Sequence, residues 1–466
     1  MKRTKIVCTI GPASAKPALL RKMIRAGMNV ARLNMSHGTY ASHRAMIRMV
    51  RQAARSLHTT VGILVDLQGP KIRVGELPKE GVTLRAGSTV VFSTDPDDRA
   101  PHYLPVSYRK LHREVRPGER VLMDDGLMEA EIVRVGGRRI TAKVVTGGVL
   151  TSHKGVNLPS SRVTLRSMTP KDYRDARFAL AEGADWVALS FVRTASDVLD
   201  LRRAIGRRKD QPRIIVKIEK PEALKNFDAI LAVTDGVMVA RGDLGIEIPA
   251  EQVPPAQKMM VRKCLAAGKP VVVATQMLDS MIRNPRPTRA EVSDVANAVI
   301  DHADAVMLSG ESATGRYPVE AVRVMARIAE ETEASHLDDL PPSPMKEPET
   351  VRSAISGAAG LIAERVGAQA VVVATLSGDT ARYIARTRPE LPIFAATPSV
   401  RSAGAVSISW GVYPFVVPMV GTVARLIALM RAKLLKLKMV RRGRRLVLVA
   451  GKWRTAGEYV LQVVEA

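Results

Sequence analysis

The stretch Arg213-Ile-Ile-Val-Lys-Ile-Glu-Lys-Pro221, together with Ala240-Arg-Gly-Asp-Leu-Gly245, decides the fold of this chain. The first stretch is a β-branched apolar run, typical of a buried strand, that ends in Lys217 and Glu219. Residues two apart on a strand point to the same face, so this ammonium and this carboxylate lie side by side. The second stretch follows another apolar run and delivers Asp243 between two glycines. The pattern predicts two neighbouring strands that each end in a carboxylate.

Such a pair of strand ends has a specific chemistry. Carboxylates from Glu219 and Asp243 suit one hard divalent cation, which prefers oxygen ligands. Lys217 beside them would stabilise negative charge that develops during a reaction, as at a phosphoryl or enolate site. A structural ion pair between Lys217 and Glu219 is the simpler alternative, and the second carboxylate at the matching position argues against it.

The chain around these stretches alternates apolar runs with segments of helical periodicity. Eight strands alternating with eight helices is the number expected for a closed (β/α)8 TIM barrel, whose active site lies at the carboxyl ends of the strands. The predicted strands are residues 5–10, 29–35, 61–67, 186–191, 213–218, 236–240, 270–275 and 305–308.

Two further regions have a different rhythm. Residues 73–163 are short β-rich runs with glycine turns, which predicts a small inserted β-barrel domain that divides the catalytic barrel into residues 1–72 and 164–337. A proline-rich linker, 338–348, precedes an α/β domain at 350–466. The elements expected in that last domain are helices 351–366, 381–386 and 423–439 and strands 370–374, 392–396, 446–449 and 459–464.

Composition limits the function classes. The chain has 71 Lys and Arg against 45 Asp and Glu, a net charge of +26 that attracts anions such as phosphorylated metabolites, nucleic acid or anionic lipid. Aromatic residues are only 4%, without the interleaving of an RNA-binding surface, so no nucleic-acid partner is expected. Cys8 and Cys264 are expected to be core residues. No signal peptide or membrane-spanning run is visible, which predicts a cytoplasmic protein without a membrane partner.

Polar residues also follow other predicted strands. Arg32, Asn34 and Ser36 share one face of the second strand, an unfavourable arrangement inside a barrel unless ligands cover it. Thr275 ends the seventh strand, where its hydroxyl and the following backbone N–H groups suit an anion, although a helix cap is the simpler explanation. Ser309 ends the eighth strand, either as a proton-relay hydroxyl or as part of a plain turn.

Several blocks closely resemble the pyruvate kinase family, in the right order over nearly the whole chain. The resemblance implies transfer of the phosphoryl group of phosphoenolpyruvate to ADP, giving ATP and pyruvate in the last step of glycolysis. It also implies a Mg²⁺ cofactor, which Mn²⁺ can replace. The matching blocks are Ala31-Arg-Leu-Asn-Met-Ser-His-Gly38, Val65-Asp-Leu-Gln-Gly-Pro-Lys-Ile-Arg73, Lys217-Ile-Glu219, Ala240-Arg-Gly-Asp-Leu-Gly245, Ala274-Thr-Gln-Met277 and Met307-Leu-Ser-Gly-Glu311.

The resemblance implies roles for individual residues. Glu219 and Asp243 would hold Mg²⁺, while Lys217 and Arg32 would stabilise the transferred phosphoryl group. The backbone at Gly242 and Asp243, with the Thr275 hydroxyl, would bind the substrate carboxylate. Protonation of the enolate would involve Thr275, Ser309 and water. The residues implied around the nucleotide are Asn34, Ser36, His37, Arg73 and Lys154.

The resemblance further implies that the inserted domain is a lid that closes over the nucleotide. It also implies a homotetramer. The loop Thr375-Leu-Ser-Gly-Asp-Thr380 resembles the effector phosphate loop of the family, with Thr375, Ser377, Gly378 and Thr380 as the expected phosphate contacts. Asp379 places a negative charge where some relatives carry a basic residue, which favours a monophosphate effector over a sugar bisphosphate.

The segment Leu67-Gln-Gly-Pro-Lys-Ile-Arg-Val74 departs from the pattern of potassium-dependent relatives, which typically read Thr-Lys-Gly-Pro-Glu-Ile-Arg-Thr. Lys71 replaces the glutamate, and its ammonium is expected to fill the monovalent-cation pocket and to exclude K⁺ by repulsion. Relatives with this Leu/Gln/Lys pattern do not need K⁺, so the enzyme is expected to be potassium-independent. The residues expected around that pocket are Asn34, Ser36, Asp66 and Leu67.

Two alternatives remain at this point. One is another Mg²⁺-dependent barrel enzyme that acts on an enolate of pyruvate, against which the inserted domain and the strand bearing Arg32 argue. The other is a nucleic-acid-binding or scaffold protein, suggested only by the charge of +26. Release of pyruvate that depends on ADP excludes both.

Overall fold

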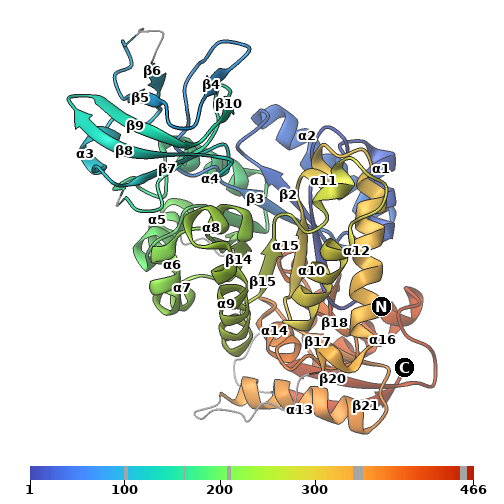
Figure 1. Ribbon diagram of the computed structural model, residues 1–466. Helices are drawn as coiled ribbons and strands as arrows, with labels where there is room; N and C mark the ends of the chain where they lie inside the picture. The colour runs from blue at the N-terminus through green and yellow to red at the C-terminus, as the bar shows by residue number, and fades with distance from the viewer. Residues whose placement is uncertain (99–102, 162, 207–210, 340–349, 452–458) are drawn as a thin grey trace.

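The computed structural model describes residues 1–98, 103–161, 163–206, 211–339, 350–451 and 459–466. Most of the predicted linker, residues 340–348, lies outside the described residues. Figure 1 shows a central barrel with a β-rich domain projecting from one end and an α/β domain packed against the opposite side. The chain enters the β-rich domain after the third barrel strand and returns before the fourth.

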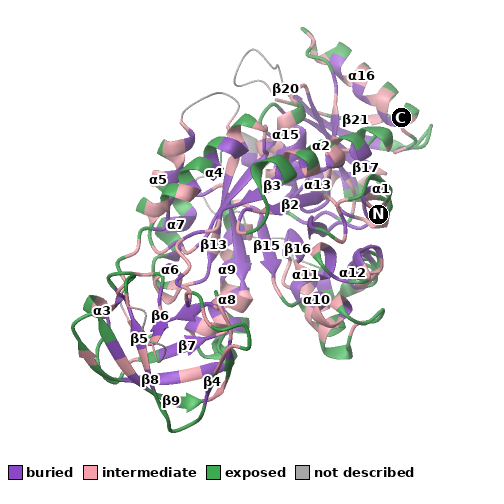
Figure 2. Ribbon diagram, turned by 90° about the horizontal axis from the view of Figure 1, so that it is seen from above, coloured by how far each residue is buried: buried purple, intermediate pink, exposed green. Residues whose placement is uncertain are grey.

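The central unit is a closed barrel with the strand order β1-β16-β15-β14-β13-β12-β3-β2. All neighbouring pairs of the eight strands are parallel, so the predicted (β/α)8 barrel is confirmed. The strands are buried along nearly their whole length, as their continuous apolar runs require (Figure 2). They are β1 (Lys5–Thr9), β2 (Val30–Asn34), β3 (Gly62–Asp66), β12 (Trp186–Leu189), β13 (Arg213–Ile218), β14 (Gly236–Ala240), β15 (Val271–Ala274) and β16 (Ala305–Leu308).

Helices follow each barrel strand. Capping boxes at Thr39, Thr169 and Thr288 start three of them by binding the free N–H groups of the first turn. The barrel helices are α1 (Pro17–Ala26), α2 (Tyr40–Ser56), α4 (Pro170–Ala181), α5 (Ala195–Ile205), α6 (Pro221–Lys225), α7 (Phe227–Val233), α8 (Arg241–Glu247), α9 (Val253–Ala267), α10 (Arg289–Ile300), α11 (Gly310–Ala313) and α12 (Pro318–Glu333), with one-turn 3₁₀ helices η1 (Ala250–Gln252), η2 (Asp279–Ile282) and η3 (His336–Asp338).

The inserted domain is built from two mainly antiparallel sheets around one hydrophobic core. Six strands form a sheet in the order β11-β7-β8-β9-β5-β6, and β10 pairs separately with β4. Core residues from both sheets, including Leu84, Phe92 and Leu150, belong to one buried cluster. The elements are β4 (Val82–Leu84), β5 (Thr89–Ser93), β6 (Tyr103–Pro105), α3 (Leu111–Glu114), β7 (Arg120–Met123), β8 (Met128–Gly136), β9 (Arg139–Thr146), β10 (Gly148–Leu150) and β11 (Val156–Asn157).

The C-terminal domain is a five-stranded sheet with the order β19-β18-β17-β20-β21, flanked by helices. Two elements were not predicted from the sequence, α15 and β19. β19 contains Pro414, which cannot donate to a sheet, and it is tolerated because β19 is an edge strand. The elements are α13 (Val351–Arg365), β17 (Ala370–Ala374), α14 (Asp379–Ala385), β18 (Ile393–Thr397), α15 (Val400–Val406), β19 (Val412–Val416), α16 (Val423–Lys436), β20 (Arg445–Gly451) and β21 (Tyr459–Glu465).

The two cysteines lie in the core, as the sequence analysis expected. Cys8 and Cys264 are free thiols with no exposed surface, and burial raises the pKa of both, so they are core residues. Within the described ranges, no helix combines the length and apolar character needed to cross a bilayer.

Helix α15 packs directly against the amino-terminal side of the barrel. The indole N–H of Trp186 donates to the carbonyl of Ala405 at 2.9 Å, and a methyl group added at Gly62 would lie 2.6 Å from the carbonyl oxygen of Gly404. The backbones of β3 and α15 are therefore in close contact, and only glycine fits at position 62.

We expect Gly62→Ala to lower the free energy of unfolding by about 1–3 kcal/mol, because the obstructing atom belongs to the backbone and cannot rotate away. Urea unfolding followed by intrinsic tryptophan fluorescence measures the loss. Gly136→Ala is the control, since a methyl group there meets no atom within 4 Å. Equal unfolding midpoints for Gly62→Ala and the wild type would contradict this packing argument.

Candidate active site

Lys217 and Glu219 lie at the carboxyl end of β13 and contact each other. The Lys217 ammonium is 2.8 Å from Glu219 Oε1 and 3.7 Å from Asp66 Oδ1, and it donates to the Ser190 hydroxyl at 3.0 Å. Burial lowers the pKa of Lys217, but the carboxylates of Asp66, Glu219 and Asp243 outweigh burial and raise it above its usual range. The result is a permanently charged ammonium at the strand ends.

Arg32, at the carboxyl end of β2, converges on the same carboxylate. Its Nε and Nη2 lie 2.7 and 2.6 Å from Asp66 Oδ2, and its Nη1 donates to the Thr9 hydroxyl at 2.8 Å. Arg32 and Lys217 thus approach Asp66 from two sides. Two cations held around one buried acid form a fixed, partly desolvated positive site, which suits a phosphoryl group.

Gly242 and Asp243 lie in the first turn of α8, which begins at the residue after β14. The Gly242 N–H donates to the Thr275 hydroxyl at 2.7 Å, so the structure brings together two groups predicted for the substrate carboxylate. Thr275 has a φ of +71°, a strained value for a β-branched residue. Such strain is concentrated at functional sites, and here it directs the Thr275 hydroxyl toward α8.

Lys71 does not occupy the position expected from the sequence. Its ammonium lies 3.5 Å from Asp243 Oδ1 and 3.6 Å from Asp125 Oδ1, and no contact joins it to Asn34, Ser36 or Asp66 among the described residues. Filling of the cation pocket by Lys71 stays a prediction, and in this structure its ammonium faces Asp243 and Asp125. Arg32 and Lys217 already approach Asp66, so a third cation there would be repelled, whereas Asp243 and Asp125 offer carboxylates.

Ser309 lies at the end of β16, in the turn that begins α11. Its backbone N–H donates to Glu311 Oε2 at 2.7 Å, and Glu311 Oε1 accepts from the Leu278 N–H at 3.1 Å. Buried Glu311 therefore ties the turn of Ser309 to the segment after Thr275. No hydrogen bond links the Ser309 and Thr275 hydroxyls in the described structure, so any relay between them requires an intervening group.

The residues predicted for the nucleotide form two groups. Asn34 accepts from the Ser36 N–H at 3.1 Å, and His37 follows in the same turn, where its carbonyl contacts the His43 ring. Arg73 lies where the chain enters the inserted domain, and Lys154 lies within that domain between β10 and β11. The Arg73 guanidinium donates to the carbonyl of His153 at 2.8 Å. The Lys154 ammonium forms an ion pair with Asp124 at 2.7 Å.

Arg73 pairs with Gly155 in an antiparallel bridge, so the segments that carry Arg73 and Lys154 run side by side at the base of the inserted domain. Among the described residues, no hydrogen bond or ion pair joins Arg73 or Lys154 to the turn of Asn34.

The donor set fits a divalent metal. Glu219 is fully buried; its Oε1 atom lies 2.8 Å from the Lys217 ammonium, and its Oε2 atom accepts from the Phe191 N–H at 2.6 Å. Burial raises the pKa of the Glu219 carboxyl, and the negative charge of Asp243 raises it further. The two carboxylates are therefore close enough to interact electrostatically. No cluster of three or more His, Cys, Asp or Glu occurs in the described residues. Two carboxylates with substrate oxygens are the typical set for Mg²⁺.

The sequence analysis did not identify Ser190, and it did not identify the contacts of Asp66 with Arg32 and Lys217. Ser190 directly follows β12, and its hydroxyl accepts from Lys217 and donates to the carbonyl of Leu67 at 2.7 Å. Asp66 was assigned only to a cation pocket, yet it is the acid shared by Arg32 and Lys217. Both residues lie at the carboxyl ends of barrel strands, so the rule that identified Glu219 would also have identified them.

The loop predicted to bind an effector contacts the opposite end of β13. Asp379 forms ion pairs with Arg382 and, at 3.4 Å, with Arg213, the first residue of that strand. Ser377 donates to Asp379 at 2.7 Å, and the Thr375 hydroxyl accepts from the Gly378 N–H at 2.9 Å. The carboxylate of Asp379, a residue of this loop, is therefore paired with two arginines.

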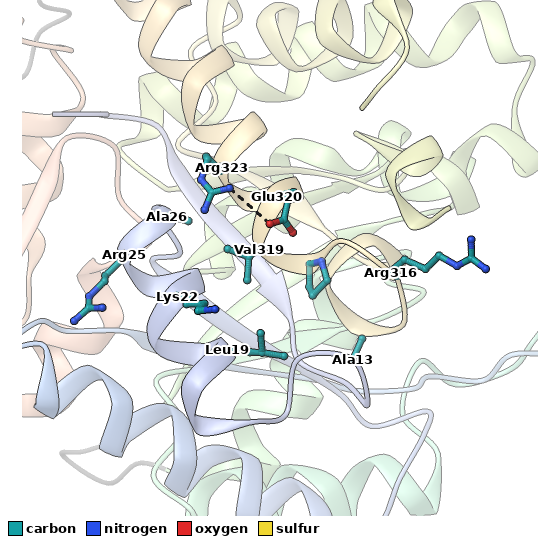
Figure 3. Close-up of a pocket in the computed structure, with 11 residues that line it drawn as sticks. Ala13, Leu19, Lys22, Arg25, Ala26, Arg316, Val319, Glu320 and Arg323 are labelled. Atoms are coloured by element: carbon teal, nitrogen blue, oxygen red, sulfur yellow. Dashed lines mark ion pairs between the residues drawn. The ribbon is translucent and has the colours of Figure 1, made fainter. Parts of the chain in front are cut away.

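A cavity of about 660 Å³ lies elsewhere, on the outer side of the barrel between α1 and α12. Figure 3 shows Arg25 and Arg316 at its edges pointing away from one another. Arg323 forms an ion pair with Glu320 at 3.7 Å. Because the cations do not converge, this cavity lacks the geometry of the strand-end site.

Fold and site together define a class: a (β/α)8-barrel enzyme whose strand ends combine two fixed cations with two carboxylates suited to a divalent metal. Comparison with known families identifies the member of that class. Residues 1–322 match the pyruvate kinase barrel domain, and residues 353–460 match the pyruvate kinase alpha/beta domain. The chain belongs to the pyruvate kinase family.

Individual relatives agree with the family assignment. A pyruvate kinase of Agrobacterium vitis is 46% identical over 426 residues, which cover 90% of this chain and 89% of the relative. A pyruvate kinase of Geobacillus stearothermophilus is 44% identical over 455 residues, 97% of this chain and 78% of the relative. Pyruvate kinase 2 of Synechocystis sp. is 47% identical over 421 residues, 89% of this chain and 71% of the relative.

Proposed function

We propose that Lys217 and Arg32, held around Asp66, are the cations that stabilise the phosphoryl group in flight. The chain is a phosphotransferase that catalyses the pyruvate kinase reaction of glycolysis, from phosphoenolpyruvate and ADP to pyruvate and ATP. The observation that carries the residue roles is the convergence of Lys217, at 3.7 Å, and Arg32, at 2.6 Å, on one buried carboxylate. Phosphoryl transfer depends mainly on positioning and charge neutralisation of this kind.

Glu219 and Asp243 are the proposed ligands of Mg²⁺, or of Mn²⁺ in its place. When bound there, the ion would act as a Lewis acid that neutralises charge developing on the substrate. Thr275 and the backbone at Gly242 and Asp243 bind the substrate carboxylate, and their mutual hydrogen bond of 2.7 Å supports this. Thr275 and Ser309, through water, deliver the proton that converts the enolate to pyruvate.

Asn34, Ser36 and His37 bind the nucleotide from the barrel, and Arg73 and Lys154 bind it from the inserted domain. We assign residues 73–163 to this lid, residues 1–72 and 164–337 to the catalytic barrel, and 350–466 to the C-terminal domain. The lid excludes water when it closes. A cytoplasmic homotetramer is the proposed state, from family membership alone.

A coupled assay tests the activity directly. Pyruvate formation is measured from phosphoenolpyruvate, with and without ADP and with Mg²⁺ or a chelator. Pyruvate release that requires both ADP and the metal supports the assignment. Release without ADP would indicate a different reaction on the same substrate.

Potassium independence is the finer proposal for this site. The Lys71 ammonium lies 3.5 Å from Asp243, so the site already contains a third fixed cation, and the buried Leu67 side chain adds no ligand oxygen. We expect full activity with Mg²⁺ in tetramethylammonium buffer that lacks sodium and potassium. Stimulation by KCl of many-fold at matched ionic strength would contradict this.

Lys71→Glu extends the same prediction. We expect this enzyme to be slower and to respond to added K⁺, because the exchange replaces a fixed cation with a carboxylate. Lys79→Glu is the matched control, since it reverses the same charge at an exposed position of the inserted domain. A potassium response in both variants would show a general charge effect instead.

The effector proposal is a monophosphate, such as AMP or a pentose phosphate, at Thr375, Ser377, Gly378 and Thr380. Asp379 lies beside this loop and is held by Arg213 and Arg382, so a second phosphate would meet its charge. We expect weak or no activation by fructose 1,6-bisphosphate in steady-state assays. Strong activation at micromolar concentrations would overturn this prediction.

A further inference from the structure

Glu247 is a buried acid outside the residues discussed so far. It ends α8, one helical turn after Asp243, and only 6% of its surface is exposed. Its Oε1 atom accepts from the Lys220 ammonium at 2.6 Å and from the Asn157 amide at 2.8 Å. A buried carboxylate requires partners of this kind, because an unpaired charge in the interior is strongly unfavourable.

The two partners come from different parts of the molecule. Lys220 directly follows Glu219, one of the proposed metal ligands. Asn157 belongs to β11 of the inserted domain and pairs with Leu122 of β7. One oxygen of Glu247 therefore joins three segments: the one with Glu219, the helix with Asp243 and the base of the lid.

Asn157 depends on this bond for its orientation. Asn157 is 6% exposed, and its Oδ1 atom has no hydrogen-bond partner in the described structure. The amide is therefore held on its Nδ2 side by Glu247. The β7–β8 turn lies nearby, since a methyl group added at Gly126 would be 3.9 Å from the Ile246 side chain of α8.

We propose that Glu247 is a positioning residue that couples the placement of the lid to the two metal carboxylates. When the Glu247 bonds are intact, the base of the lid, Glu219 and Asp243 keep one relative arrangement. This inference rests on the proposed roles of Glu219 and Asp243 in metal binding. Glu247 itself contacts neither substrate nor metal, so it acts through its neighbours.

The first measurement reads the lid directly. Spin labels at Val133→Cys in the lid and Leu199→Cys on α5 use positions that are 56% and 42% exposed, and the two native cysteines are buried. We expect Glu247→Ala and Asn157→Ala to broaden the distance distribution between the labels. Glu251→Ala, at an exposed acid shortly after α8, is the matched control and should leave it unchanged.

The second measurement reads the metal site and the kinetics. For Glu247→Ala we expect the Mn²⁺ dissociation constant and the KM for ADP to rise by about 10–100-fold, as for loss of a group that supports metal ligands. The double variant Glu247→Ala/Asn157→Ala should lose no more lid order than Glu247→Ala alone. Glu247→Gln should recover part of the lid order, because its amide oxygen can still accept from Asn157.

Separate outcomes overturn separate claims. A narrow distance distribution in Glu247→Ala would overturn the role of Glu247 at the lid. A broad distribution with unchanged Mn²⁺ binding would overturn its coupling to the metal carboxylates. The metal assignment itself is tested by Glu219→Gln, and the label distances do not depend on it, so failure of that assignment is recognised independently.

Discussion

Lys217→Met is expected to lower kcat by about 10²–10³-fold, the usual effect of removing one positioned charge that stabilises a transition state. The methionine keeps the length of the side chain and removes only the ammonium, which lies 2.8 Å from Glu219. The KM for phosphoenolpyruvate should change much less than kcat, because the charge matters most when the phosphoryl group is in flight. Steady-state kinetics at saturating Mg²⁺ measures both constants.

The control for this variant is Lys225→Met, which makes the same exchange at an exposed position of α6. It should behave as the wild type. Circular dichroism checks that Lys217→Met remains folded, since the change leaves the carboxylates of Asp66 and Glu219 without one of their cations. A folded Lys217→Met enzyme with near wild-type kcat would refute the role of Lys217.

Glu219→Gln and Asp243→Asn are expected to weaken Mg²⁺ binding by at least the roughly 10–100-fold that loss of a group supporting the ligands costs. Each exchange removes one of only two carboxylates proposed to hold the ion. The apparent Mg²⁺ constant should rise in activity assays, and Mn²⁺ binding measured by electron paramagnetic resonance should weaken without substrate present.

Asp228→Asn serves as the comparison for both variants. Its side chain is 75% exposed on α7, where it forms an ion pair with Lys263. The exchange therefore changes the net charge by the same amount as the two site variants, but away from the site. Metal titrations of Asp228→Asn should match the wild type. If Glu219→Gln and Asp243→Asn also match it, neither residue is a metal ligand.

The sequence was sufficient for the barrel because parallel strands buried on both faces form continuous apolar runs. All eight predicted strands are present, and Lys217 and Glu219 lie on one side of β13 as their spacing requires. The edge strand β19 was missed because Pro414 interrupts its pattern, and an edge position cannot be recognised without the sheet order.

The position of Lys71 shows a limit of a different kind. The sequence indicated a cation near the active site, and the structure places it against Asp243 and Asp125. Which acid a flexible lysine pairs with depends on the acids that other cations already occupy. Arg32 lies 34 positions before Asp66 and Lys217 lies 151 positions after it, so this competition has no local signature in the sequence.

The sequence by itself determined the barrel, the interruption after its third strand, and the strand ends that deliver Arg32, Lys217, Glu219 and Asp243, because periodicity and strand-end position are local properties. Tertiary structure alone decided which of these side chains meet. Asp66 joins Arg32 to Lys217, and Glu247 joins the lid to Lys220. Those contacts depend on chain segments far apart in sequence being packed at hydrogen-bond distance, which only the closed barrel and the docked lid provide.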